Sequence, residues 1–95
     1  PAIMTARFSR YVAGLSAYTP DGLMLLGKIP GISGMMVASG CCGNGIAMSG
    51  GVAEAICDLA KGKAPAFDIS AFDPARFGEI NPYTEQFRND CANAR

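Results

Sequence analysis

A short apolar run, a glycine-rich turn and a helical pattern follow one another in the middle of the chain, and this order constrains the fold most. Met35–Ala38 is the apolar run, and the turn spans residues 40–45. From Gly45 to Lys61 apolar residues recur at helical spacing, and Gly62 then offers a stop. We therefore predict a buried strand, a tight turn and a helix whose N-cap is Asn44, with Ser49 as the alternative.

The residues before this unit favour two more strands joined by a turn. Thr5–Leu15 is an extended segment, and Leu23–Gly27 is a short apolar run. Between them, Tyr18–Gly22 contains Thr-Pro-Asp-Gly, in which proline presets φ and Asp-Gly tolerates positive φ. We expect the two strands to form a β-hairpin, followed by a Pro-Gly loop at residues 28–34.

The last third of the chain changes character. Residues 64–77 carry aromatic side chains without a regular period, which indicates an ordered tail laid across a surface. Asp68 and Arg76 are candidates for an ion pair within that tail. Pro82–Ala94 predicts a short terminal helix that starts near Thr84. The expected fold class is therefore α/β, more narrowly an α+β fragment: a β-hairpin plus a strand–glycine turn–helix unit.

The composition excludes several classes of function. Eight basic and eight acidic residues cancel among 95, so no strong field attracts nucleic acid or an anionic membrane. Strictly apolar runs such as Leu23–Leu26 are far shorter than the ~20 residues of a membrane-spanning helix. The absence of histidine and of a Cys-x2-Cys motif argues against a zinc site, and we expect no metal.

The cysteines favour a reducing compartment. Two of the four, Cys41 and Cys42, are adjacent, which disfavours a secreted disulfide scaffold, so we expect reduced thiols in a cytoplasmic protein. A helix N-terminus lowers a thiol pKa, which leaves a redox role for this pair as an alternative. Small side chains that fill a tight turn are the favoured interpretation.

The glycine turn is the one candidate site. A helix N-terminus offers unpaired N–H groups and a partial positive charge, and glycines let a flat ligand approach the backbone. Such a joint more often serves tight packing alone. The dinucleotide fingerprint is absent, because no third glycine follows Gly43-Asn44-Gly45 at the required spacing. No nucleophile–base or paired-carboxylate arrangement is evident, so catalytic residues stay unassigned.

Three segments in order carry a resemblance to a known family. They are Gly14–Gly27, which holds Thr-Pro-Asp-Gly and an apolar run, then Gly34–Gly40, then Gly43–Ile46. Together with the tail from Asp68 to Phe77, they resemble the C-terminal end of the D-amino-acid-oxidase-like flavoproteins, which include glycine oxidase, sarcosine oxidase and dimethylglycine dehydrogenase. The resemblance covers about residues 14–77.

The resemblance implies an FAD-dependent oxidoreductase that removes a hydride from the carbon next to an amine. The glycine turn would donate backbone hydrogen bonds to one edge of the flavin ring, and an N-terminal Rossmann part outside this chain would hold most of the cofactor. The residues implied to bind FAD are Gly14, Leu15, Cys41, Cys42, Gly43, Asn44, Gly45 and Ile46.

Two positions depart from the family pattern. Several relatives place an arginine at Ser16 or a lysine at Ala47, near the substrate, and neither cation is present here. No cysteine lies at the covalent flavin position near Gly14, so the implied FAD is noncovalent. Ser16 and Ala47 remain the candidate substrate-binding positions.

The resemblance also implies the organisation of the chain. Residues 1–95 would be one C-terminal fragment: residues 1–34 form strands at the substrate-domain edge, 35–63 the flavin-binding unit and 64–95 the tail. Its partners would be the remainder of the flavoprotein, or a larger subunit, and a small amine such as sarcosine, glycine or dimethylglycine. We expect the chain alone to be inactive. The alternative is a non-catalytic interaction module or small subunit derived from the same fold.

Overall fold

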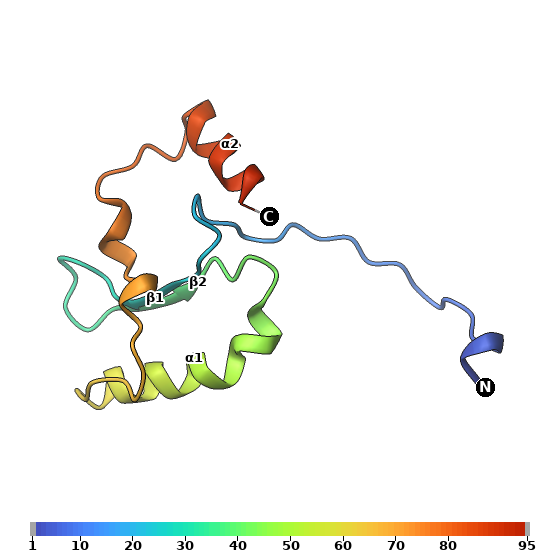
Figure 1. Cartoon of the computed structure of the whole chain (residues 1–95), viewed down its shortest axis with the longest axis horizontal. Coiled ribbons are helices and arrows are strands. Elements are labelled where there is room, and N and C mark those ends of the chain that lie inside the picture. Colours follow the sequence, from blue (N-terminus) through green and yellow to red (C-terminus); the bar gives the residue numbers. More distant parts are fainter. Residues whose placement is uncertain (1, 95) are drawn as a thin grey trace.

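A two-stranded antiparallel sheet and one long helix form the centre of the molecule (Figure 1). The computed structural model describes residues 2–94. Strand β1 (Leu25–Lys28) pairs with β2 (Met36–Ser39), and Leu26 lies opposite Ala38. The helices are α1 (Gly45–Ala60) and α2 (Glu85–Asn93), with short 3-10 helices η1 (Ala2–Thr5), η2 (Ser70–Phe72) and η3 (Pro74–Phe77). The fold class is α+β, as predicted.

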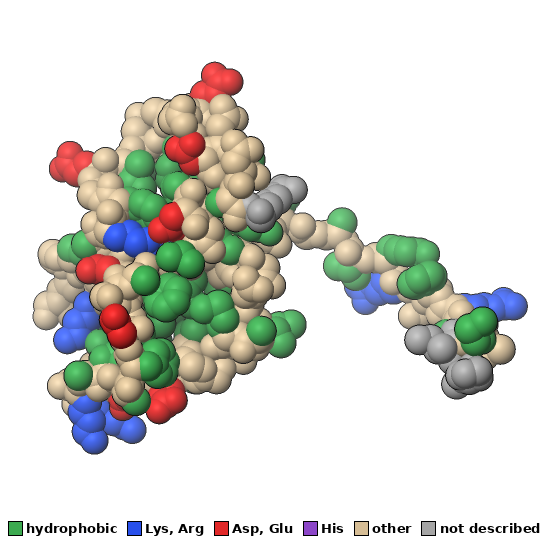
Figure 2. Space-filling model, in the orientation of Figure 1, with side chains coloured by type: hydrophobic (Ala, Val, Ile, Leu, Met, Phe, Trp, Pro, Cys, Tyr) green, Lys and Arg blue, Asp and Glu red, His purple; other side chains and the backbone are tan. Residues whose placement is uncertain are grey.

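The core lies between β1 and α1. Met24, Leu26 and Ala55 are its fully buried apolar residues among those described, and half-buried side chains of α1 and of the tail surround them. The strand β1 contacts α1, η2 and η3 as well as β2. Figure 2 shows the apolar side chains gathered over this part of the body. So few fully buried side chains provide little stability by themselves.

Helix α1 ends as its sequence predicts. Gly62 has a φ of +71°, and the N–H of Lys63 donates to the carbonyl of Asp58 at 2.9 Å. The N–H of Gly62 donates to the carbonyl of Leu59, which completes a Schellman motif. The C-terminal helix is also confirmed, with Thr84 at its N-cap accepting a hydrogen bond from the N–H of Phe87.

The strand predicted at Thr5–Leu15 is wrong. After η1, residues 6–17 form an extended, exposed N-terminal arm that points away from the body (Figure 1) and takes no part in the two-stranded sheet. The radius of gyration is 17.1 Å, against about 12 Å for a compact domain of this size. An extended segment becomes a strand only where it pairs with another strand. Among the described residues, no strand pairs with the arm.

The hairpin therefore lies one connection later than predicted. The turn at Pro20–Gly22 is present, but the strands that pair are β1 and β2, joined by the Pro-Gly loop. The run Met35–Ala38 does contain a strand, yet β2 is not buried and Met35 is exposed. In a sheet of two strands, β2 is an edge strand. Among the described residues, no strand pairs with the edge of β2 that faces away from β1.

The tail lies across β1 as expected, but its predicted ion pair is wrong. Asp68 accepts a hydrogen bond at 2.8 Å from the N–H of Ser70, and that bond lowers the pKa of its carboxyl. Arg76 instead pairs with Asp21, far back in the sequence. The predicted packing of the tail is correct, and the partner of Arg76 comes from another segment.

The described residues include no helix whose length and apolarity would suit a bilayer crossing.

Substituting alanine at Gly40 and at Gly31 separates backbone strain from steric contact. Both glycines have positive φ, +64° and +75°, so an alanine at either costs about 1–2 kcal/mol. A Cβ at Gly40 would also lie 2.7 Å from Cγ2 of Thr19, whereas one at Gly31 would meet nothing within 4 Å. Gly40→Ala should therefore lower the free energy of unfolding of the intact protein by about 1–3 kcal/mol more than Gly31→Ala, measured by chemical denaturation. Equal losses would contradict this packing.

Candidate functional site

An open hollow of about 380 Å³ lies at the N-terminus of α1. Its volume falls within the roughly 300–1,000 Å³ of small-molecule sites. Two segments line it: the end of the N-terminal arm, and the end of β2 with the glycine turn and the start of α1. The lining residues carry no charge; they are Ser16, Ala17, Ala38, Ser39, Gly40, Cys41, Gly43, Gly45 and Ile46. We call residues 40–46 the glycine loop.

A larger hollow, of about 660 Å³, lies between the Pro-Gly loop and the C-terminal end of α1. Its walls are mostly apolar side chains and glycines, with Lys28 and Ser33 as the polar exceptions. A helix C-terminus presents carbonyl groups and a partial negative charge. The smaller hollow is the better candidate site, because it lies where a helix offers hydrogen-bond donors.

The glycine loop is held by short-range hydrogen bonds and by the arm. The N–H of Cys42 donates to the carbonyl of Ala17 at 3.1 Å, which joins the two walls of the hollow. The N–H of Asn44 donates to the carbonyl of Cys41 at 2.8 Å. Cys42 has a φ of +48°, a conformation that costs a residue with a side chain about 1–2 kcal/mol. Such strain persists where surrounding contacts determine the backbone.

The N-terminus of α1 is open to a ligand. Asn44 occupies the N-cap position, as predicted, but its side chain makes no capping hydrogen bond. The first turn contains no acidic residue. The N–H groups of that turn and the partial positive charge of the helix are therefore available to an electron-rich atom at the hollow.

The structure brings together part of the predicted site. Ser16 lines the hollow with five members of the glycine loop, so the arm and the loop form one concave surface. Gly14 and Leu15 lie on the exposed arm, where a Cβ at Gly14 would meet no atom within 4 Å. Cys42 and Asn44 belong to the loop but do not line the hollow. Ala47 lines a different hollow, above the core, so the structure does not place it with Ser16.

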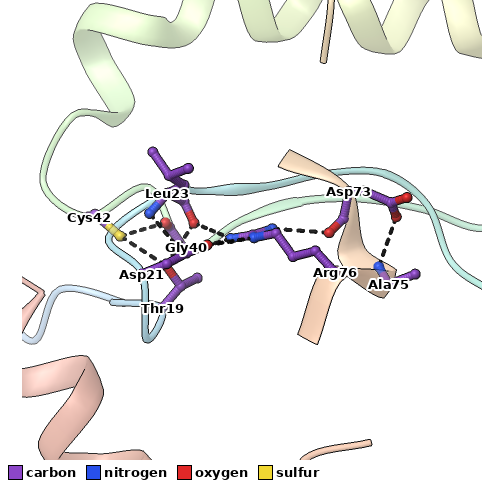
Figure 3. A network of polar contacts seen from close by, with 8 residues as sticks. All are labelled: Thr19, Asp21, Leu23, Gly40, Cys42, Asp73, Ala75 and Arg76. Carbon is purple, nitrogen blue, oxygen red and sulfur yellow. Dashed lines mark hydrogen bonds and ion pairs between the residues drawn. The ribbon is translucent and has the colours of Figure 1, made fainter. Parts of the chain in front are cut away.

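A polar network beside the glycine loop escaped sequence analysis (Figure 3). Arg76 on η3 donates from Nε to Asp21 Oδ2 at 2.7 Å and from Nη2 to Asp21 Oδ1 at 3.0 Å. Nη2 also donates to the carbonyl of Leu23 at 2.6 Å. Thr19 Oγ1 lies 3.0 Å from Asp21 Oδ1 and 3.5 Å from Cys42 Sγ. Both charged residues were visible in the sequence, but no local pattern predicts a pair separated by 55 positions.

The network favours the ionised form of Asp21. The hydrogen bonds from Arg76 hold the pKa of its carboxyl well below the usual range, although partial burial acts in the opposite direction. The N–H of Leu23 and the hydroxyl of Thr19 stabilise the same charge. Asp21 is therefore ionised throughout the physiological pH range.

Asp21 should make stability depend on pH in acid. A carboxyl whose pKa is lowered on folding stabilises the protein fully above its unfolded pKa, about 3.9. This contribution begins to fall below that value and is lost as pH falls through the lower folded pKa. Asp21→Asn should cost about 1 kcal/mol of unfolding free energy near neutral pH, since the pair is partly exposed, and the deficit should shrink towards about pH 3. Glu54→Gln, at an exposed position on α1, is the matched control. A deficit that stays constant down to that pH would contradict the role of Asp21.

Comparisons with known proteins give a consistent set of relatives. The chain is 31% identical over 77 residues to a 4-methylaminobutanoate oxidase (formaldehyde-forming) from Paenarthrobacter nicotinovorans, covering 81% of this chain and 9% of the relative. It is 34% identical to mitochondrial dimethylglycine dehydrogenase of Mus musculus, covering 90% and 10%. It is 36% identical to a glycine oxidase of Geobacillus kaustophilus, covering 80% and 20%.

The chain thus spans about a tenth to a fifth of the length of these relatives. No protein-family model and no solved structure matches it.

Proposed function

The chain belongs to the D-amino-acid-oxidase-like family of FAD-dependent oxidoreductases, and we propose that it forms one wall of the flavin site of a larger amine oxidoreductase. The observation that carries the proposal is the hollow shared by the arm and the glycine loop. Relatives named as oxidases or dehydrogenases of glycine and methylated amines support the reaction class, oxidation at a carbon–nitrogen bond.

The hollow suits a flat ring with an electron-rich edge. Its walls are uncharged, so binding a ring there removes no ionised side chain from water. Glycines and small residues leave room for a planar group. The uncapped N-terminus of α1 supplies N–H donors that favour negative charge on that edge. When bound, FAD supplies the two-electron acceptor. The residues that would contact it are the members of the glycine loop that line the hollow, with Ser16 and Ala17 from the arm.

Ser16 is the substrate-facing position that the geometry supports. It lines the hollow, and its hydroxyl can donate to or accept from a small polar substrate. The hollow contains no arginine or lysine, so a substrate carboxylate would need a cation from outside this chain. Ala47 lines the separate hollow above the core, among apolar residues, and we assign it a packing role there.

The remainder of a larger flavoprotein is the partner that we propose. The segment that these relatives share with this chain makes up between 9% and 20% of their length. Phe8, Tyr11 and Val12 of the arm are exposed, as expected of a segment that another part of a protein covers. The small amine substrate and the noncovalent FAD would bind only in that assembly, so the chain alone should be inactive.

An alternative is a non-catalytic interaction module that keeps the fold. The absence of a cation at Ser16 and Ala47 favours it, because a carboxylate-binding group is missing from both positions. The exposed apolar arm fits either function. The two are distinguished by whether the native protein contains flavin.

Two glycines of α1 provide the test. The intact native protein should release noncovalent FAD on acid treatment, detected by its absorbance and fluorescence. Gly45 lines the hollow, and a Cβ there would lie 3.3 Å from Cβ of Cys41, whereas Gly50 has open space. Gly45→Leu should lower FAD affinity at least about ten-fold, and Gly50→Leu should leave it unchanged. A native protein that lacks flavin and cannot be reconstituted with FAD would exclude the proposed function.

A further inference from the structure

We infer that Arg76 is a positioning residue that holds the glycine loop in its flavin-facing shape, acting through Asp21, Thr19 and Cys42. This inference rests on the proposed function for its ligand, and on the hydrogen-bond network for its mechanism. The network joins three segments that are distant in sequence: the tail, the turn before β1 and the glycine loop (Figure 3).

Each nitrogen of the Arg76 guanidinium donates a hydrogen bond. Nε and Nη2 donate to Asp21, Nη2 also donates to the carbonyl of Leu23, and Nη1 donates to the carbonyl of Asp73 at 3.1 Å. The ring of Phe77 lies 4.3 Å below the guanidinium carbon. The Arg76 side chain is 15% exposed although its residue lies on the surface tail. Lysine has no planar fork and cannot reproduce these contacts.

The turn does not need Arg76 to close. The N–H of Gly22 donates to the carbonyl of Thr19, and Asp21 Oδ1 accepts from the N–H of Leu23, so local hydrogen bonds already make the turn. Arg76 fixes the orientation of the Asp21 carboxylate. Oδ1 of that carboxylate accepts from Arg76 Nη2 and is also the oxygen that contacts Thr19 Oγ1. The ion pair therefore acts on the position of Thr19 more than on the existence of the turn.

Thr19 contacts the glycine loop directly, so its position affects the loop. It is the buried polar residue of the described chain, at 5% exposure. Its hydroxyl lies 2.7 Å from the carbonyl of Leu23 and 3.5 Å from Cys42 Sγ, and its methyl group fills the space beside Gly40. Cys42 Sγ donates in turn to the carbonyl of Gly40 at 3.0 Å.

Cys42 is the residue on which the loop shape depends. Its positive φ is unfavourable for a residue with a side chain, so its conformation relies on the contacts around it. Those contacts come from Thr19, from Gly40 and from the carbonyl of Ala17. If Thr19 shifts, the loop can relax from the conformation that forms one wall of the hollow.

The first test uses flavin binding by the intact native protein. Arg76→Gln should weaken FAD affinity about ten-fold, and Arg88→Gln, at an exposed position on α2, should not. Thr19→Val loses the hydroxyl and keeps the shape, so it should weaken binding similarly. Thr19→Ser keeps the hydroxyl and loses only the methyl group beside Gly40, so it should weaken binding less than Thr19→Val. Adding Arg76→Gln to Thr19→Val should cause little further loss, because both act on one path. Native FAD affinity in folded Arg76→Gln and Thr19→Val proteins would overturn the inference.

The second test does not depend on flavin. The four cysteines are free, and the alkylation rate of each can be followed by mass spectrometry in the same sample. Arg76→Gln should raise the rate at Cys42 at least roughly three-fold, and leave Cys57 on α1 unchanged. Equal acceleration at Cys42 and Cys57 would mean general unfolding, and no acceleration would mean a rigid loop; either result would overturn the positioning role.

The two tests separate the inference from the proposed function. A native protein without flavin, in which Cys42 alone reacts faster after Arg76→Gln, would exclude the flavin site and support the network. A native protein with flavin, whose affinity and Cys42 reactivity are unaffected by Arg76→Gln, would keep the proposed function and exclude the positioning role.

Discussion

The contacts of the buried Thr19 hydroxyl determine how the turn, the tail and the glycine loop are arranged. The turn, the tail and the glycine loop each reach this residue by a different route: Asp21 Oδ1 directly, Arg76 through Asp21, and Cys42 by its sulfur. The methyl group of the same side chain packs against Gly40, where only a glycine fits. One threonine therefore fixes the distance between the turn before β1 and the loop after β2.

The apolar core is small, so this polar network has a large part in placing the segments. Three fully buried apolar residues lie between β1 and α1, and the remaining apolar contacts are half-buried. Neither β2 nor the N-terminal arm has a covered outer side among the described residues. These exposed surfaces agree with a chain that spans a tenth to a fifth of its relatives, because a larger protein would bury them.

Local sequence signals predicted the local structure well. The extent of α1, its stop at Gly62, the turn at Pro20–Gly22 and the start of α2 near Thr84 all depend on neighbouring residues, and all are confirmed. The strand at Thr5–Leu15 failed because strand formation needs a distant partner that a sequence pattern does not reveal. The buried state of Met35 failed for the same reason, since burial depends on which surfaces meet.

In the candidate site, too, local features could be predicted from the sequence and long-range contacts could not. The glycine loop and the helix N-terminus were predictable, because glycines and helix starts have local signals. That Ser16 would face the loop, and that Ala47 would not, depends on how the arm and α1 lie in space. The pairing of Arg76 with Asp21 joins residues 55 positions apart and was likewise outside the reach of local patterns.

The central claim is that the glycine loop and the end of the arm face a flavin. Amide hydrogen exchange, compared between the apo and FAD-reconstituted forms of the intact protein, tests it most directly, because it reports on each backbone N–H in turn. FAD should slow exchange at residues 16–17 and 40–46, with residues 29–34 of the Pro-Gly loop unaffected. Protection elsewhere in the protein, with no change at residues 40–46, would contradict the claim.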